Sequence, residues 1–184
     1  WASLRAMGDS LHRAAEVGEG ADAAGADREN ADGGRYLAEI LLAQTRREVF
    51  GDPDFPVFRP QFPESAHVGL VNPDNLYESA QIRPGVDYRV RGTRGTTADV
   101  VFQVYEASPG VKGSLKGIST LSADALELDA DGGFEIHVGP TPHPVNWLDG
   151  GETGGLLLVR WSHSDWETER AGKVEIVRLG GEGE

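Results

Sequence analysis

The arginines inside strand-like segments are the residues of this chain best suited to bind an anion. Arg89 and Arg91 alternate with apolar residues, so both guanidinium groups are expected on one face of their segment. Arg160 directly follows the apolar run 156–159. A guanidinium buried in such a run must meet a carboxylate or a carbonyl, because an unpaired buried charge costs several kcal/mol.

These arginines have two interpretations. In the functional one, Arg91 and Arg160 bind a carboxylate or another small anion at the mouth of a β-sandwich. In the structural one, each arginine belongs to an internal ion pair, and Asp165 or Asp99 is the expected partner of Arg160. The residue pattern leaves both interpretations open.

An asparagine and a tryptophan stand in the crossing between two predicted strands. Trp147 could stack on a ring or a sugar, or it could plug the end of the fold. Asn146 could contact a ligand, or it could hold backbone groups in a turn. Under the functional interpretation, the ligand-binding residues are expected to be Arg91, Asn146, Trp147, Arg160 and His163.

The sequence contains no complete set of catalytic residues. His137 and His143 lie in a hairpin-like stretch, but no third ligand follows at a recognised spacing, so no metal site is predicted. The run 162–165 has the residue types of a catalytic triad, but neighbours in a strand point to opposite faces. Nucleotide-binding and nucleophile-elbow motifs are absent as well, so no cofactor is predicted.

The sequence is therefore compatible with two functions. The first is a structural or ligand-binding module without its own catalytic machinery. The alternative is an enzyme, or the substrate-binding half of one, that acts on a small carboxylate-bearing or hydrophobic organic molecule. A second domain or subunit that covers the sandwich is a further possible partner.

Composition argues against several partner classes. The 184 residues carry a formal net charge of −13, which repels phosphate backbones and anionic lipids, so neither nucleic acid nor a membrane surface is expected as a partner. There is no cysteine and no apolar run of about 18 residues, so the sequence predicts neither disulfides nor a membrane span. No signal peptide is visible, which predicts a cytoplasmic protein, although the chain begins at Trp1 and its true start is left open.

The elements that would position these residues fall into four parts. Residues 1–51 predict two helices, the first over 1–16 and the second ending near Phe50. Residues 52–65 contain four prolines and three phenylalanines, which predict an extended strap that lays Phe55, Phe58 and Phe62 across a core. Residues 66–180 predict the sandwich, and 181–184 a tail.

Short strands separated by turn residues dominate the region 66–180. Several alternate between apolar and polar residues, with no helical pattern between them, which predicts an antiparallel, jelly-roll-like β-sandwich. The predicted strands are His67–Val71, Leu76–Ile82, Asp87–Arg94, Ala98–Ala107, Gly117–Leu121, Phe134–Val138, Gly155–Ser162 and Lys173–Leu179.

At these same residues the chain resembles the family called domain of unknown function 1214, which often accompanies domain 1254. The shared pattern is the D-x-D-G-G turn that begins at Asp129, the Asn-Trp-Leu run 146–148 and the Leu-x-x-Arg run 157–160. The run 72–92 is similar to the first strands of bacterial members, and the likeness extends over about 27–179.

This resemblance implies a jelly-roll-like sandwich from a bacterium or archaeon, corresponding to the N-terminal half of a longer member. The chain departs from the family pattern at 149–152, which replaces a loop that usually contains proline, and at Trp161, where many members have the aromatic residue one position later.

Overall fold

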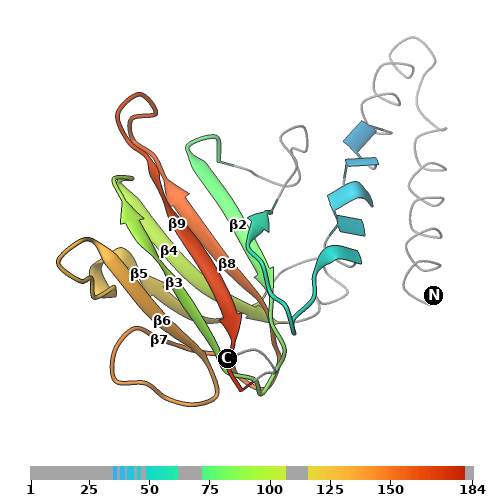
Figure 1. Cartoon of the computed structure of the whole chain (residues 1–184). Coiled ribbons are helices and arrows are strands. Elements are labelled where there is room, and N and C mark those ends of the chain that lie inside the picture. Colours follow the sequence, from blue (N-terminus) through green and yellow to red (C-terminus); the bar gives the residue numbers. More distant parts are fainter. Residues whose placement is uncertain are drawn as a thin grey trace, which may run out of the picture. The chain divides into compact units, whose positions relative to one another are not determined.

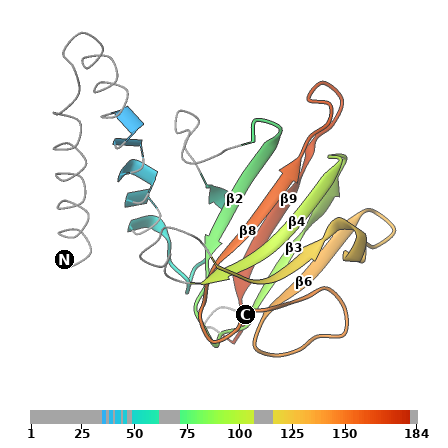
Figure 2. The same ribbon diagram turned by 180° about the vertical axis from the view of Figure 1, so that it is seen from behind.

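The computed structural model describes residues 35–36, 38–39, 41–43, 45–46, 49–61, 72–106 and 116–180. In this part of the chain two β-sheets lie face to face (Figure 1, Figure 2). Sheet A has the strand order β1-β2-β8-β4-β5, and sheet B has the order β7-β6-β3-β9. The strands are β1 (Arg59–Pro60), β2 (Asn75–Gln81), β3 (Tyr88–Gly95), β4 (Asp99–Glu106), β5 (Gly117–Ser122), β6 (Gly133–Gly139), β7 (Trp147–Asp149), β8 (Gly154–Ser162) and β9 (Ala171–Arg178), with a 3₁₀ turn, η1 (Ala123–Ala125), after β5.

The predicted β-sandwich is confirmed as a mainly β structure of two sheets, while the strand order does not confirm the jelly-roll winding. Adjacent strands are antiparallel except β6 and β7, which run parallel. Each predicted strand from Leu76 onward is present within two residues of its expected ends. The short strands β1 and β7 were not predicted, and the predicted strand His67–Val71 lies outside the described residues.

Alternation of side chains builds the core between the two sheets. Phe134, Ile136 and Val138 face inward from β6 and are 7%, 0% and 1% exposed, as their spacing predicted. The ring of Phe134 meets that of Phe102 from β4 edge to face, with ring centroids 5.3 Å apart and planes at 71°. Because these two residues belong to different sheets, this aromatic pair fastens one layer to the other.

The chain divides into two compact units, residues 1–45 with 62–70 and residues 46–61 with 71–184. The sandwich belongs to the second unit. The described residues of 35–50 are helical, and Arg35 pairs with Glu39 one turn later, at 3.4 Å. The first predicted helix, over 1–16, lies outside the described residues. No helix among the residues that the structure describes is long and apolar enough to span a membrane.

The strap prediction is correct for only one of its three phenylalanines. Phe58 packs against the core, but Phe55 is 75% exposed, and Phe62 lies outside the described residues. Phe55 is exposed because polar contacts anchor this part of the strap: the carbonyl of Pro53 accepts a hydrogen bond from the Tyr88 hydroxyl at 2.9 Å, and Asp54 forms ion pairs.

Two glycines of sheet B let large rings approach its backbone. A Cβ atom on Gly92 would lie 2.7 Å from Cζ of Phe134, and one on Gly172 would lie 2.7 Å from Cη2 of Trp161. Both hypothetical Cβ atoms would also collide with a backbone carbonyl of the neighbouring strand. Glycine is therefore needed at both positions for the aromatic rings to pack as they do.

We expect Gly172→Ala to lower the free energy of unfolding by about 1–3 kcal/mol, because the added methyl group overpacks the contact with Trp161. Urea denaturation measures this loss. Gly117→Ala is the matched control, since its Cβ would lie 3.9 Å from the nearest atom, Cε1 of Tyr105. Equal stability of the two variants would contradict the packing argument.

Candidate functional site

The outer face of sheet B carries a row of charged and imidazole side chains. In the register of β3 and β6, Arg89 lies opposite His137 and Arg91 lies opposite Glu135. The residues between them, such as Val90 and Ile136, are 0% exposed and face the core. The polar residues must therefore face away from the core.

Glu135 is the centre of this row. Its Oε2 lies 2.7 Å from Nε of Arg91 and 3.9 Å from Nε of Arg89, and its Oε1 lies 3.2 Å from Nε2 of His137. Partial burial acts to raise the pKa of Glu135, but the hydrogen bond and charge of Arg91, with smaller contributions from Arg89 and His137, hold that pKa below its ordinary value. Two arginines thus share one carboxylate.

The loop between β6 and β7 brings a second histidine onto this face. Thr141 anchors the loop, because its backbone N and its Oγ1 donate to the carboxylate of Asp87 at 3.1 and 2.6 Å. Nδ1 of His143 lies 2.8 Å from the carbonyl of Val145. The ring of His143 then stacks on that of His137, with centroids 3.6 Å apart and planes at 12°.

This stacked pair is not arranged to chelate a metal ion. A metal ion lies close to the plane of each imidazole that binds it, because the nitrogen lone pair lies in that plane. The rings of His137 and His143 are nearly parallel, with centroids 3.6 Å apart, so their lone pairs do not converge on one point. In the described ranges, no group of three or more His, Cys, Asp or Glu residues could hold a metal ion.

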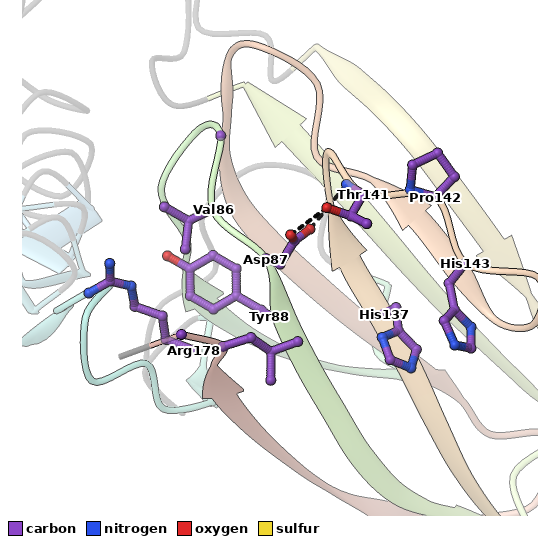
Figure 3. Close-up of a pocket in the computed structure, with 11 residues that line it drawn as sticks. Val86, Asp87, Tyr88, His137, Thr141, Pro142, His143 and Arg178 are labelled. Atoms are coloured by element: carbon purple, nitrogen blue, oxygen red, sulfur yellow. Dashed lines mark hydrogen bonds between the residues drawn. The ribbon is translucent and has the colours of Figure 1, made fainter. Parts of the chain in front are cut away.

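A pocket of about 420 Å³ lies beside the histidine pair, and we call it the Arg178 pocket (Figure 3). In the close-up, His137 and His143 lie on one side, Tyr88 and Arg178 lie on the other, and the Asp87–Thr141 hydrogen bonds lie between them. Its lining residues come from the turn before β3, from β6 and its following loop, and from the end of β9: Gly85, Val86, Asp87, Tyr88, His137, Thr141, Pro142, His143, Arg178, Leu179 and Gly180.

Tyr88 and Arg178 form the side of the pocket opposite the histidines, and hydrogen bonds hold both side chains in place. Tyr88 is fully buried, and its hydroxyl donates to Pro53 O and accepts from Arg83 N, each at 2.9 Å. Burial is the main reason that the pKa of Tyr88 lies above its ordinary value. Nη1 of Arg178 donates to Asp54 at 2.9 Å, whereas its Nε is buried without a hydrogen-bond partner among the described residues.

A second, more open hollow of about 600 Å³ shares the histidine pair; we call it the Glu127 pocket. Its charged lining residues are Arg91, Glu127, Asp129 and Glu135, so carboxylates outnumber guanidinium groups there. Arg91 is already paired with Glu135 at 2.7 Å. This hollow is therefore a poorer place for an anion than the sequence pattern suggested.

The structure does not bring the five predicted ligand-binding residues together. Arg91 and Trp147 share the outer face of sheet B, where Trp147 lies opposite His137 and donates from Nε1 to Gly139 O at 3.1 Å. Arg160 belongs to β8 of sheet A. Its neighbour Trp161 is 0% exposed and faces the core, so Arg160 lies on the outer face of sheet A, on the other side of the sandwich.

Arg160 also lacks the ion pair that the structural interpretation expected. Within the described residues no salt bridge joins it to Asp165 or Asp99, and its Nε is buried without a hydrogen-bond partner. It lies near Tyr105, whose pKa is raised by burial while the charge of Arg160 opposes that shift.

Asn146 and His163 are both buried, and only Asn146 bonds the backbone through its side chain. Asn146 is 8% exposed, and its side chain accepts from Glu127 N and donates to Glu127 O, both at 2.8 Å. Its φ of 46° is the one positive value among the described non-glycine residues. His163 is 6% exposed, and its ring stacks on Trp166 at 3.9 Å.

Sequence reasoning missed the residues that build the Arg178 pocket. The sequence pattern suggested His137 and His143 only as metal ligands, and it did not predict Tyr88, Asp87 or Arg178 as site residues. The available signal was the pair of prolines around Thr141, which predicts a loop that turns sharply away from β6. The direction of that turn depends on the Asp87 contact, which pairs residues 54 positions apart.

Comparison with known proteins gives a strong structural likeness. No family model and no curated protein matches the chain. A crystal structure of an uncharacterized protein from Burkholderia cenocepacia is similar, with a TM-score of 0.87 and 31% sequence identity over 98% of this chain. This chain covers 51% of that protein and thus spans about half of its length.

A protein from Vibrio parahaemolyticus is similar over 85% of this chain and 47% of its own, with 12% identity and a TM-score of 0.44. That likeness is too weak to support an inference about the fold or the site.

We expect Asn146→Ala to lower the free energy of unfolding by about 2–4 kcal/mol, because it leaves two backbone groups of Glu127 unpaired and places alanine at a positive φ. Chemical denaturation measures the loss. Asn146→Gly relieves the backbone strain but not the lost hydrogen bonds, so it should be less destabilising by about 1 kcal/mol. A wild-type-like Asn146→Ala variant would show that these bonds contribute nothing.

The contribution of Glu135 to stability should depend on pH. Its pKa is lower in the folded chain than the ordinary value of 4.5, so the stabilisation is complete above about pH 4.5 and is lost as the pH falls through the folded-state pKa. The stability difference between wild type and Glu135→Gln should therefore shrink on acidification. Urea titrations at a series of pH values test this, with the exposed Glu152→Gln as control; a difference independent of pH would refute it.

Proposed function

We propose that this chain is a non-catalytic β-sandwich module that binds a small organic molecule in the Arg178 pocket. The bound molecule has a largely apolar body and one group, such as a carboxylate or carbonyl, that accepts hydrogen bonds. The observation that carries the proposal is a pocket of about 420 Å³ whose lining includes two imidazoles and a guanidinium with one buried, unpaired donor.

The polar atoms of the pocket favour an acceptor on the ligand. Arg178 can only donate hydrogen bonds, and its buried Nε has no acceptor among the described residues. Asp54 pairs with Nη1 of Arg178, and the carboxylate of Asp87 accepts two hydrogen bonds from Thr141. His137 and His143 add imidazole nitrogens on the opposite side. A ligand that supplies an acceptor would balance these groups.

The size and the remaining walls favour a small molecule with apolar surface. A volume of about 420 Å³ is within the range of small-molecule sites. Val86, Pro142 and Leu179 provide apolar contact, and the faces of stacked imidazoles suit planar groups. In this proposal the module works in the cytoplasm, and another domain or subunit covers part of the sandwich.

A second candidate function is the substrate-binding half of an enzyme that acts on such a molecule. The observation in its favour is that the chain spans only about half of the Burkholderia cenocepacia protein. In that case catalytic groups would come from the other half, and the Arg178 pocket would position the substrate.

We also propose that the chain belongs to the family of domain of unknown function 1214. The residues that carry the resemblance have defined roles: Oδ1 of Asp129 accepts from the backbone N of Asp131 and of Gly133, and Asn146 clamps Glu127. An experimental structure of a family member tests this. Its matching asparagine should have a positive φ and hold the backbone of the segment before the D-x-D-G-G turn.

The ligand proposal predicts that small molecules with an apolar body and an acceptor group raise the Tm of the chain. A panel of small aliphatic and aromatic carboxylates, each paired with the corresponding alkane or arene, is screened at about ten times the expected dissociation constant. Binding should raise Tm by about 2–4 °C for the members with an acceptor group. His143→Ala, which removes one wall of the pocket, should abolish the shift.

Val177→Ala is the matched control, because Val177 is 45% exposed on β9 and lines neither pocket. It should keep the full shift. The proposal fails if no member of the panel raises Tm, or if the shift is the same in wild type and His143→Ala.

A further inference from the structure

One edge of sheet B is long and regular, and no strand among the described residues pairs with it. In the order β7-β6-β3-β9, strand β9 has a neighbour on one side only. It is eight residues long, contains no proline, and pairs with β3 in one unbroken register from Arg178 opposite Tyr88 to Ala171 opposite Gly95. Such an edge is a template for another strand, and proteins usually protect it.

The other sheet edges among the described residues are protected in ways that β9 is not. Strand β1 has two residues and contains Pro60, and β7 has three residues. Strand β5 pairs with β4 through a register shift between Val104 and Tyr105. These are the usual devices against strand addition, namely short length, proline and irregularity.

The backbone groups that β9 leaves free follow from its pairing with β3. Leu179 N donates to Asp87 O, so in an antiparallel ladder Val177, Glu175 and Lys173 also direct their backbone groups at β3. Gly172, Val174 and Ile176 therefore turn their N–H and C=O groups toward the open side. No described residue is bonded to the N–H of Val174 or Ile176.

We propose that β9 pairs antiparallel with β9 of a second copy of this chain, about a two-fold axis that passes beside Val174. The two four-stranded sheets then form one continuous sheet of eight strands. Val174 bonds to the partner's Val174, and Gly172 bonds to the partner's Ile176. The inference does not depend on the proposed ligand.

Charge complementarity selects this register. Lys173 and Glu175 are exposed on the same, outer face of β9. With Val174 on the axis, Lys173 lies opposite the partner's Glu175, and Glu175 lies opposite the partner's Lys173. These are non-hydrogen-bonded pairs, in which opposing side chains are closest, so both ion pairs form at short range.

The neighbouring symmetric registers are disfavoured by the same two residues. In any allowed register, the outward backbone groups of Gly172, Val174 and Ile176 must bond to the same kind of groups on the partner strand. The two-fold axis can therefore lie beside Val174, or one residue away on either side. Moving the axis to Glu175 would set two glutamates opposite each other, and moving it to Lys173 would set two lysines opposite each other. Like charges directly opposite in a sheet are destabilising.

The test is sedimentation velocity of the full chain over a range of concentrations. One strand pair is a small interface between chains of net charge −13, so we expect a dissociation constant on the order of 100 μM at about 0.15 M salt. Lys173→Glu and Glu175→Lys should each weaken dimerisation about tenfold. The double variant K173E/E175K restores both ion pairs and should return close to the wild-type constant.

Val174→Pro gives an independent test. It removes an N–H that faces the open edge and is not part of the ladder with β3, so it should abolish the dimer. Glu152→Lys is the matched control: it makes the same charge change as Glu175→Lys at an exposed position in the turn before β8, and it should leave dimerisation unchanged. Circular dichroism checks that each variant is folded. If Val174→Pro is unfolded, the charge-reversal variants alone decide the test.

Several outcomes would overturn the proposal. If the chain is strictly monomeric at about 1 mM, β9 does not pair with a second copy. A dimer that is insensitive to Val174→Pro and to both charge reversals would lie at another surface. Failure of the double variant to regain dimerisation would exclude the register centred on Val174.

Discussion

The contact of large aromatic rings with two glycines on sheet B determines much of this structure. Phe134 lies against Gly92, and Trp161 of the opposite sheet lies against Gly172. Any side chain at either glycine would collide with a ring and with the backbone of the neighbouring strand. The Trp161–Gly172 contact therefore sets how closely the sheets approach, and both contacts fix the inward faces of β3, β6 and β9, since a slip of one residue would reverse every side chain.

That register decides what sheet B presents to solvent. With Val90 and Ile136 in the core, the outward row must consist of Arg89, Arg91, Glu135 and neighbouring His137. Of this row, His137 also lines the Arg178 pocket. One end of the pocket is held by Tyr88 and Arg178, which are anchored by hydrogen bonds to Pro53 and Asp54.

The strands were predictable because a half-buried strand alternates with a period of two residues, and that signal is local. The order of the strands is not local. Arg91 and Arg160 each stand in a well-predicted strand, but nothing in their surroundings tells that β3 and β8 belong to different sheets with opposite outer faces. The same limit applies to Phe55: proline predicted an extended segment, but its polar anchors, Arg83 and Arg178, lie far along the chain.

The clamp formed by Asn146 requires an amide, which carries both a donor and an acceptor. Its amide both donates to and accepts from the backbone of Glu127 at a site that is 8% exposed. Deamidation would convert that amide into a carboxylate, which has no donor and carries a negative charge beside a carbonyl oxygen. The loop before β7 is therefore held to the segment after η1 by a side chain that aspartate could not replace.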